Sequence, residues 1–253
     1  MIVGGNEAVD EEKVKLLKEY VQECGSIVFF GGAGVSTESN IPDFRSENGI
    51  YNAVNQYGYP PETMLSHSFF ISHPDIFFDY LRKNLIYPDA KPNNAHIGLA
   101  KLEEMGKLKA VITQNIDNLH QMAGSKNVYE LHGTLYKNYC TKCGKNFDVD
   151  YVMNSSGIPR CDKCGGIVRP DVVLYEEGLD GTTIYKSVDA IEKADVLIVG
   201  GTSLNVYPAA GLIDYYRGNK LVLINKSVTS YDRRANLIIR ENIGEVFKEV
   251  LGL

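Results

Sequence analysis

The sequence predicts an α/β fold, a Rossmann-like doubly wound parallel sheet that carries a smaller inserted module with a zinc site and helices. Two observations predict the sheet. Short apolar runs alternate with helical stretches, and the runs are almost continuously hydrophobic, as in strands buried on both faces. A third observation predicts the module, because two long stretches interrupt the alternation and one of them carries four paired cysteines.

The first predicted element is an amphipathic helix over 10–24, because Val14, Leu17 and Val21 recur at helical spacing. The strand-like runs that follow cover 26–30, 110–113, 128–131, 196–199, 221–224 and 236–239. Helical stretches separate most of them, at 96–105, 116–123, 187–193 and 209–217.

The two interruptions, 41–95 and 134–172, are expected to fold together over the sheet. Residues 1–253 are therefore interpreted as a single domain with two subdomains. The large subdomain is predicted from about 1–40, 96–133 and 173–253, and the small subdomain from a helical insertion, 41–95, and a zinc-binding insertion, 134–172.

Composition limits the class of protein. With 44% hydrophobic and 23% charged residues, the chain is excluded from the wholly disordered, collagen-like and coiled-coil classes. Its net charge of −6 makes it a poor general binder of nucleic acid, so no direct nucleic-acid partner is expected. The acidity favours a basic peptide only weakly, and composition alone favours a role in solubility.

The apolar runs are far shorter than the ~20 residues of a membrane span. The first residues also lack the basic and then apolar regions of a signal peptide. A cytoplasmic protein with no membrane contact is therefore expected. A monomer is expected as well.

Five predicted strands end in small or polar clusters, at 31–34, 114–117, 132–133, 200–203 and 225–226. Ligands of open parallel sheets bind beyond the carboxyl ends of the strands, so one large polar site is expected along this edge. In the first cluster, Gly32 and Gly34 are expected to let the backbone approach a pyrophosphate, which free N–H groups would hold. The dinucleotide fingerprint is incomplete, because Thr37 replaces its third glycine and no acidic residue ends a strand ~20 positions later. Taken alone, this turn fits a purely structural role as well as it fits a phosphate-binding role.

The cysteines provide the most specific inorganic signal. Cys140 and Cys143 form one CxxC pair and Cys161 and Cys164 a second, with 17 residues between the pairs. In a chain without an export signal, this spacing is typical of a closed tetrahedral Zn²⁺ site with a structural role. An iron–sulfur cluster and a redox dithiol are the alternatives. Cys24 stands alone and is interpreted as a small core residue.

His132 is the histidine that best fits a catalytic role, because it directly follows a predicted strand at the polar edge. An imidazole titrates near neutral pH and suits a general base. The alternative is a hydrogen-bonded packing role, which fits His67, His73 and His96. His120 is compatible with either.

Five ordered motifs resemble those of the sirtuins, the silent-information-regulator type NAD-dependent protein lysine deacylases. They are GAGVSTESNIPDFRS at 32–46, TQNIDNLH at 113–120, His132-Gly133, the four cysteines, and GTSLNVYPA at 201–209. The resemblance extends from about residue 10 to residue 250, and the ordered set is specific although each motif alone is weak. It implies a bacterial-type single-domain deacetylase.

Such an enzyme removes acetyl from lysine and releases nicotinamide and O-acetyl-ADP-ribose through an alkylimidate intermediate, with His132 as the general base. NAD is then a consumed co-substrate, and one Zn²⁺ ion is structural.

The resemblance also implies roles for individual residues. The catalytic residues would be His132, Asn115 and Asp117. The cofactor would contact Ala33, Thr37, Phe44, Arg45, Gln114, Asn115, Ile116, Asp117, His132, Thr202, Ser203, Asn225 and Ile243. An acetylated lysine peptide or protein would pair as an added strand between 173–177 and 204–206, with Val173, Tyr175, Glu176 and Val206 in contact.

Two departures from the sirtuin pattern are informative. Asn40 stands where glycine is common, and asparagine tolerates a left-handed backbone better than most residues. Sirtuins that prefer succinyl or malonyl groups carry a Tyr and an Arg at the positions of Phe78 and Leu81. This apolar pair offers an acidic acyl tail no counter-charge, so a neutral group such as acetyl is expected.

Other functions remain open on the same residues. The scaffold also fits a protein mono-ADP-ribosyltransferase, another acyl-lysine deacylase, or a non-enzymatic dinucleotide sensor or interaction module. His132 and Asn115 argue against pure binding. A hydride-transferring dehydrogenase is the least favoured, because the acidic ribose-binding position is missing and the cysteines would be unexplained.

Overall fold

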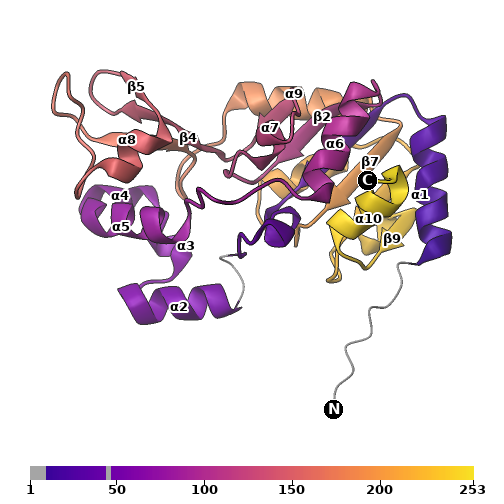
Figure 1. Cartoon of the computed structure of the whole chain (residues 1–253), viewed down its shortest axis with the longest axis horizontal. Helices are drawn as coiled ribbons and strands as arrows, with labels where there is room; N and C mark the ends of the chain where they lie inside the picture. The colour runs from indigo at the N-terminus through magenta and orange to yellow at the C-terminus, as the bar shows by residue number, and fades with distance from the viewer. Residues whose placement is uncertain (1–9, 44–46) are drawn as a thin grey trace, which may run out of the picture.

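The computed structural model describes residues 10–43 and 47–253, without the side chains of 47–50, and contains the expected parallel sheet (Figure 1). Its strands are β1 (Ile27–Gly31), β2 (Leu108–Thr113), β3 (Val128–Glu130), β7 (Val196–Gly200), β8 (Leu221–Ile224) and β9 (Leu237–Ile239). They lie in the order β3-β2-β1-β7-β8-β9, and every neighbouring pair is parallel. The chain winds outward from β1 to β3 on one side and from β7 to β9 on the other. The predicted doubly wound sheet is confirmed.

Side chains of the central strands alternate between the two faces of the sheet. Ile27 and Phe29 of β1 pack into one apolar cluster, and Val28 and Phe30 pack into a second. The first cluster is covered by α1 (Glu11–Glu23), α6 (Asn94–Glu104) and α10 (Ile243–Leu251), and the second by α9 (Gly181–Glu192) and the 3₁₀ helix η3 (Ala209–Tyr215). Since each large apolar side chain contributes ~2 kcal/mol when fully buried, β1 needs a continuously apolar sequence.

Several predicted helices have different bounds in the structure. Helix α9 begins at Gly181 instead of 187, because the Asp180 side chain accepts a hydrogen bond from Thr183 N (2.7 Å) and caps the helix. The helix predicted over 116–123 is reduced to α7 (Leu119–Met122), because Asn118 before it is left-handed (φ 64°). Residues 209–215 form a 3₁₀ helix, and α10 was not predicted.

The two insertions lie together beside the carboxyl edge of the large sheet, on the left of Figure 1. The first contains α2 (Glu47–Tyr57), α3 (Pro61–Met64), α4 (His67–Ser72) and α5 (Pro74–Asn84). The second contains the antiparallel sheet β5-β4-β6, with β4 (Gly133–Cys140), β5 (Asn146–Phe147) and β6 (Val168–Val172), and helix α8 (Val149–Asn154).

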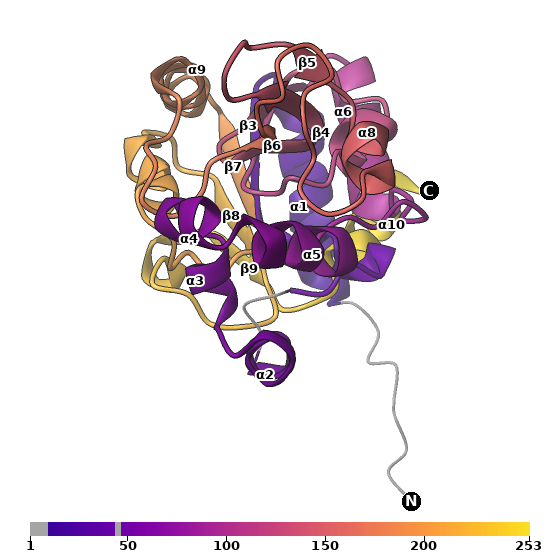
Figure 2. The ribbon, with the colours of Figure 1, turned by 90° about the vertical axis from the view of Figure 1, so that its left-hand side faces the viewer.

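A single apolar cluster joins the insertions. Phe70, Phe77 and Leu81 from the first pack with Leu135 and Val168 from the second. Figure 2 shows α3, α4 and α5 in front of the strands of the large sheet. In the part of the chain that the structure describes, no helix combines the length and the apolar character needed to cross a membrane.

Candidate active site

A pocket of about 270 Å³ lies between the carboxyl edge of the large sheet and the two insertions. The loops after β1, β2, β3 and β7 contribute to its lining, as expected for the carboxyl ends of parallel strands. The predicted site residues in this lining are Ala33, Gln114, Asn115, Ile116, Asp117, His132, Val173, Tyr175, Glu176, Thr202, Ser203 and Val206.

Five predicted cofactor contacts are not placed in the pocket. Phe44 and Arg45 lie outside the described residues. Thr37 Oγ1 donates to Gly34 O (2.9 Å) and Asn225 Nδ2 donates to Ser227 O (2.9 Å). Ile243 is buried in the core under the sheet. The roles of these residues toward a dinucleotide stay predictions.

The glycine turn after β1 packs against the loop after β7. Gly34 N donates to Gly201 O (2.8 Å), and a Cβ on Gly34 would lie 2.8 Å from Gly201 Cα. A Cβ on Gly32 would lie 2.9 Å from the Thr202 Cβ. These glycines therefore allow two site loops to touch. The prediction that free N–H groups of this turn hold a pyrophosphate is wrong for Gly34, whose N–H is already engaged.

Ser36 connects two of the predicted catalytic residues, although it was not itself predicted as a site residue. Its Oγ donates to Asp117 Oδ2 (2.6 Å) and accepts from Asn115 Nδ2 (3.1 Å). Leu119 N donates to the other Asp117 oxygen (3.0 Å). Burial raises the pKa of Asp117, against the effect of these donors. Ser36 is itself buried, so the three polar side chains hold one another in a single arrangement.

His132 lies between β3 and β4, at the pocket wall. Its Nδ1 is 3.0 Å from Gln114 O. A carbonyl oxygen only accepts hydrogen bonds, so Nδ1 carries the proton and Nε2 is the basic atom of the neutral ring. The next residue must be glycine, since Gly133 has φ 72° and a Cβ there would lie 1.9 Å from Asp171 O. This geometry suits His132 to accept a proton through Nε2.

Backbone strain is concentrated around the pocket. The non-glycine residues with positive φ in the described ranges are Asn40 (61°), Asn118 (64°), Glu176 (76°) and Leu204 (58°). All four lie in loops after β1, β2, β6 or β7. Asn40 confirms the expected tolerance of asparagine for this conformation. For Glu176 and Leu204 the conformation is costly and persists only where the surroundings enforce it, which is typical of functional sites.

His96 and His120 form a buried pair behind the site loop that leads into α7. Their ring centroids are 4.7 Å apart, and neither side chain is more than 1% exposed. His96 Nδ1 accepts from Asn93 N, but His96 Nε2 and both His120 ring nitrogens have no hydrogen-bond partner among the described residues. His120 therefore has a packing role, and it does not reach the pocket lining.

This pair predicts a loss of stability in mild acid. Burial lowers the pKa of His96 to about 4 and holds that of His120 well below 6.5. Below pH 6.5 these two histidines bind protons in the unfolded chain but stay neutral in the folded chain. The free energy of unfolding therefore falls as the pH falls toward 4. His96 alone should account for about 3 kcal/mol over this window.

Urea unfolding at several pH values between 7 and 4.5 measures this slope, the change of the unfolding free energy with pH. The variant His120→Leu should reduce it, while His73→Ala, at a partly exposed position, should not. An equal slope in wild type and His120→Leu would contradict the assignment to the buried pair.

The four paired cysteines form one compact cluster. The Sγ atoms of Cys140 and Cys164 are 3.4 Å apart, those of Cys143 and Cys161 are 3.7 Å apart, and all four lie within 4.8 Å of one another. Tetrahedral Zn²⁺ with ~2.3 Å bonds would place its sulfurs ~3.8 Å apart, whereas a disulfide needs ~2.05 Å. All four are free thiols, so the donor set fits one structural zinc ion.

Two tight turns present these thiols in pairs. Gly144 N donates to Cys140 O (3.0 Å), and Gly165 N donates to Cys161 O (2.8 Å). Both glycines have φ 70°, a conformation that favours glycine. The matching turns explain why both CxxC pairs are followed by glycine.

The apolar end of the pocket is lined by Leu65, Phe77, Leu81 and Leu85. Of the two predicted positions, Leu81 is in this lining and Phe78 is not, and Phe77 lines the pocket instead. On a helix, one residue changes the direction of a side chain by about 100°. The lining is nevertheless apolar at Phe77 and Leu81.

The chain as a whole is similar to known proteins. The Sir2 family model matches residues 32–208 of this chain. An NAD-dependent protein deacetylase of Clostridium acetobutylicum is 65% identical over 241 residues, covering 95% of this chain and 98% of that protein. A protein of the same name from Clostridium perfringens is 60% identical over 242 residues, covering 95% and 99%.

Solved structures agree with this similarity. A structure described as Sir2-p53 peptide-NAD+ has a TM-score of 0.84 and 39% identity, covering 94% of this chain and 97% of that chain. Another Sir2 structure, with deacetylated p53 peptide and 3'-O-acetyl ADP ribose, has a TM-score of 0.85 and 40% identity, also covering 94% and 97%.

Proposed function

The chain belongs to the Sir2 family, and we infer that it is an NAD-dependent protein deacetylase that removes acetyl groups from lysine side chains. NAD is consumed, with release of nicotinamide and O-acetyl-ADP-ribose, and the cysteine cluster holds one structural zinc ion. One observation carries the inference most directly: His132, from the loop after β3, and Asn115 and Asp117, from the loop after β2, line the same pocket.

We propose that NAD lies along the carboxyl edge of the sheet, in contact with Ala33 and with residues 114–117 and 202–203. These residues line the pocket, and the lining combines amide, hydroxyl and carboxyl groups suited to ribose and carboxamide. Thr37, Phe44, Arg45, Asn225 and Ile243 complete the proposed contacts from the sirtuin resemblance.

The chemistry requires an enclosed site and one base. NAD⁺ supplies a ribose carbon that becomes electrophilic as the positively charged nicotinamide leaves, and the amide oxygen of acetyl-lysine attacks it. The protein orients both reactants, and polar groups that are already fixed need no reorganisation during the reaction. The hydrogen bonds of Ser36 hold Asn115 and Asp117 in such a fixed arrangement.

The proposed base is His132. Gln114 O holds the proton on Nδ1, which leaves Nε2 to accept a proton from a ribose hydroxyl. Asp117 is proposed to act with Asn115 in binding the ribose.

We propose that an acetylated lysine peptide passes between segments 173–177 and 204–206. Val173, Tyr175, Glu176 and Val206 line the pocket beside the residues proposed to bind NAD. An extended peptide that pairs with these segments would place its lysine side chain toward His132.

A panel of acyl-lysine peptides tests this function. With NAD⁺, the acetyl peptide should react at least tenfold faster than the succinyl peptide, because Phe77 and Leu81 offer no counter-charge to a carboxylate. Nicotinamide release and peptide mass measure the two sides of the reaction. Faster turnover of the succinyl peptide, or no release of nicotinamide with any acyl group, would contradict the proposal. Retention of ADP-ribose on the peptide would instead indicate mono-ADP-ribosylation.

We also propose the division into two subdomains at the predicted boundaries, since the two insertions share one apolar cluster. The monomeric state, the cytoplasmic location and the absence of nucleic-acid partners stay predictions of the sequence.

A further inference from the structure

The segment that follows β6 connects both insertions with the proposed base. Val173 N donates to His132 O (2.9 Å). Two residues later, Tyr175 N donates to Leu65 O (2.9 Å) and His67 N donates to Tyr175 O (3.0 Å), which forms a short parallel bridge to the start of α4. We name residues 173–177 the connecting segment. It spans the distance between the helical insertion and the His132 turn.

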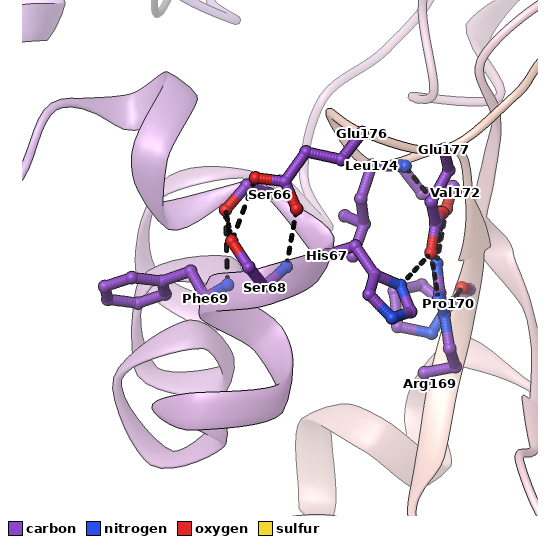
Figure 3. A network of polar contacts seen from close by, with 10 residues as sticks. All are labelled: Ser66, His67, Ser68, Phe69, Arg169, Pro170, Val172, Leu174, Glu176 and Glu177. Carbon is purple, nitrogen blue, oxygen red and sulfur yellow. Dashed lines mark hydrogen bonds and ion pairs between the residues drawn. The ribbon is translucent and has the colours of Figure 1, made fainter.

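Two adjacent glutamates anchor this segment in different directions (Figure 3). Glu177 turns back toward β6, where Arg169 donates to both of its carboxylate oxygens (2.7 and 3.0 Å). Although burial opposes it, hydrogen bonds from Arg169 and His67 lower the pKa of Glu177 to about 2. This carboxylate is therefore charged at neutral pH and fixes one end of the segment.

Glu176 turns toward α4. Its Oε2 accepts from Ser68 N (2.9 Å) and its Oε1 accepts from Ser68 Oγ (2.9 Å). Ser66 Oγ accepts from Phe69 N (3.2 Å), so each of these first-turn N–H groups of α4 has its own side-chain acceptor. The acceptor for Ser68 comes from a distant part of the chain.

The backbone of Glu176 is strained at φ 76°. A glutamate adopts this conformation at a cost, and only where other contacts enforce it. The two hydrogen bonds from Ser68 offset part of that cost. Glu176 lines the pocket, but both of its carboxylate oxygens already accept hydrogen bonds from Ser68.

We propose that Glu176 is a positioning residue for peptide recognition: by binding Ser68, its carboxylate holds the connecting segment in the conformation against which the acetylated peptide pairs. The proposal rests on the function proposed above. Binding to a segment that is already ordered carries a smaller ordering cost, so the peptide binds more tightly. The contact therefore affects the affinity for peptide and has little effect on NAD affinity or on proton transfer.

Steady-state kinetics with the acetyl peptide test this role. Glu176→Ala should raise the KM for peptide about fivefold, the order of effect of losing a helix cap, with kcat and the KM for NAD⁺ changed by less than about twofold. Glu176→Gln keeps one acceptor oxygen and should recover most of the loss. Glu176→Gly relieves the backbone strain, so its KM for peptide should lie between the values for Glu176→Ala and Glu176→Gln. The control Glu192→Ala, at an exposed position on α9, should behave as wild type.

Ser68→Ala keeps the N–H donor and should raise the KM less than Glu176→Ala. Adding it to Glu176→Ala should have no further effect, since the two side chains act through one contact. An unchanged peptide KM in Glu176→Ala, a loss confined to kcat, or equal impairment by Gln and Ala would overturn the proposal.

Amide hydrogen exchange separates this proposal from the proposed function. The amides of His67 and Tyr175 should exchange faster in Glu176→Ala, and Glu176→Gln should slow them again, whether or not the chain deacetylates peptides. Unchanged exchange at both amides would also overturn the proposal. If the exchange responds but wild type releases no nicotinamide, the proposed function fails instead.

Discussion

Replacing His132 with alanine is expected to lower deacetylation by about 10²–10⁴-fold while leaving NAD⁺ affinity largely intact. The reason is the geometry of the imidazole. Gln114 O fixes its protonated Nδ1 at 3.0 Å, so that Nε2 is the atom that accepts a proton. Alanine removes the proposed base but leaves Asn115, Asp117 and their hydrogen bonds through Ser36 in place.

Nicotinamide release and calorimetric titration with NAD⁺ measure the two quantities separately. His73→Ala is the matched control, because His73 contacts Ser72 and Phe69 between α4 and α5 and should keep its turnover. A His132→Ala protein with more than about a tenth of wild-type turnover would remove this residue from the role of base. Loss of NAD⁺ binding together with turnover would also contradict it and indicate a binding role.

Replacing Cys161 with serine should release the zinc ion and unfold the zinc-binding insertion, with loss of turnover. Structural zinc sites contribute roughly 10–16 kcal/mol in small peptides, as much as the whole stability of a typical domain. The effect should extend to the active site, because β4 and β6, which lead to the cluster, pair Gly133 with Val172 beside His132.

Three measurements test these consequences. Elemental analysis gives the zinc content, proteolysis within 134–172 reports unfolding of the insertion, and nicotinamide release gives the turnover. Cys24→Ser is the matched control, since it removes a buried thiol outside the cluster and should keep zinc and activity. A zinc-free Cys161→Ser protein that resists protease and turns over normally would show that the ion is dispensable for this insertion.

The strands and the position of the site could be predicted because their signals are local. Continuous apolar runs follow from burial on both faces of the sheet, as in β1 and β7. The polar clusters after those runs meet because parallel strands have their carboxyl ends on one edge. The spacing of the cysteines likewise reflects two short turns closed by Gly144 and Gly165.

Other features depend on contacts between distant residues. Ser36 was indistinguishable from its polar neighbours until the fold brought it to Asp117, 81 residues away. The pairing of His96 with His120 and the contact of Glu176 with Ser68 are of the same kind. Helix α10 is different, because Ile243, Val246 and Phe247 recur at helical spacing and could have predicted it.

The coupling of deacetylation to NAD⁺ consumption is tested most directly by following all products of one reaction with acetyl-lysine peptide and NAD⁺. We expect nicotinamide, deacetylated peptide and O-acetyl-ADP-ribose to accumulate in equal amounts, and no peptide to be deacetylated when NAD⁺ is omitted. Deacetylated peptide accompanied by free acetate and undiminished NAD⁺ would contradict this coupling.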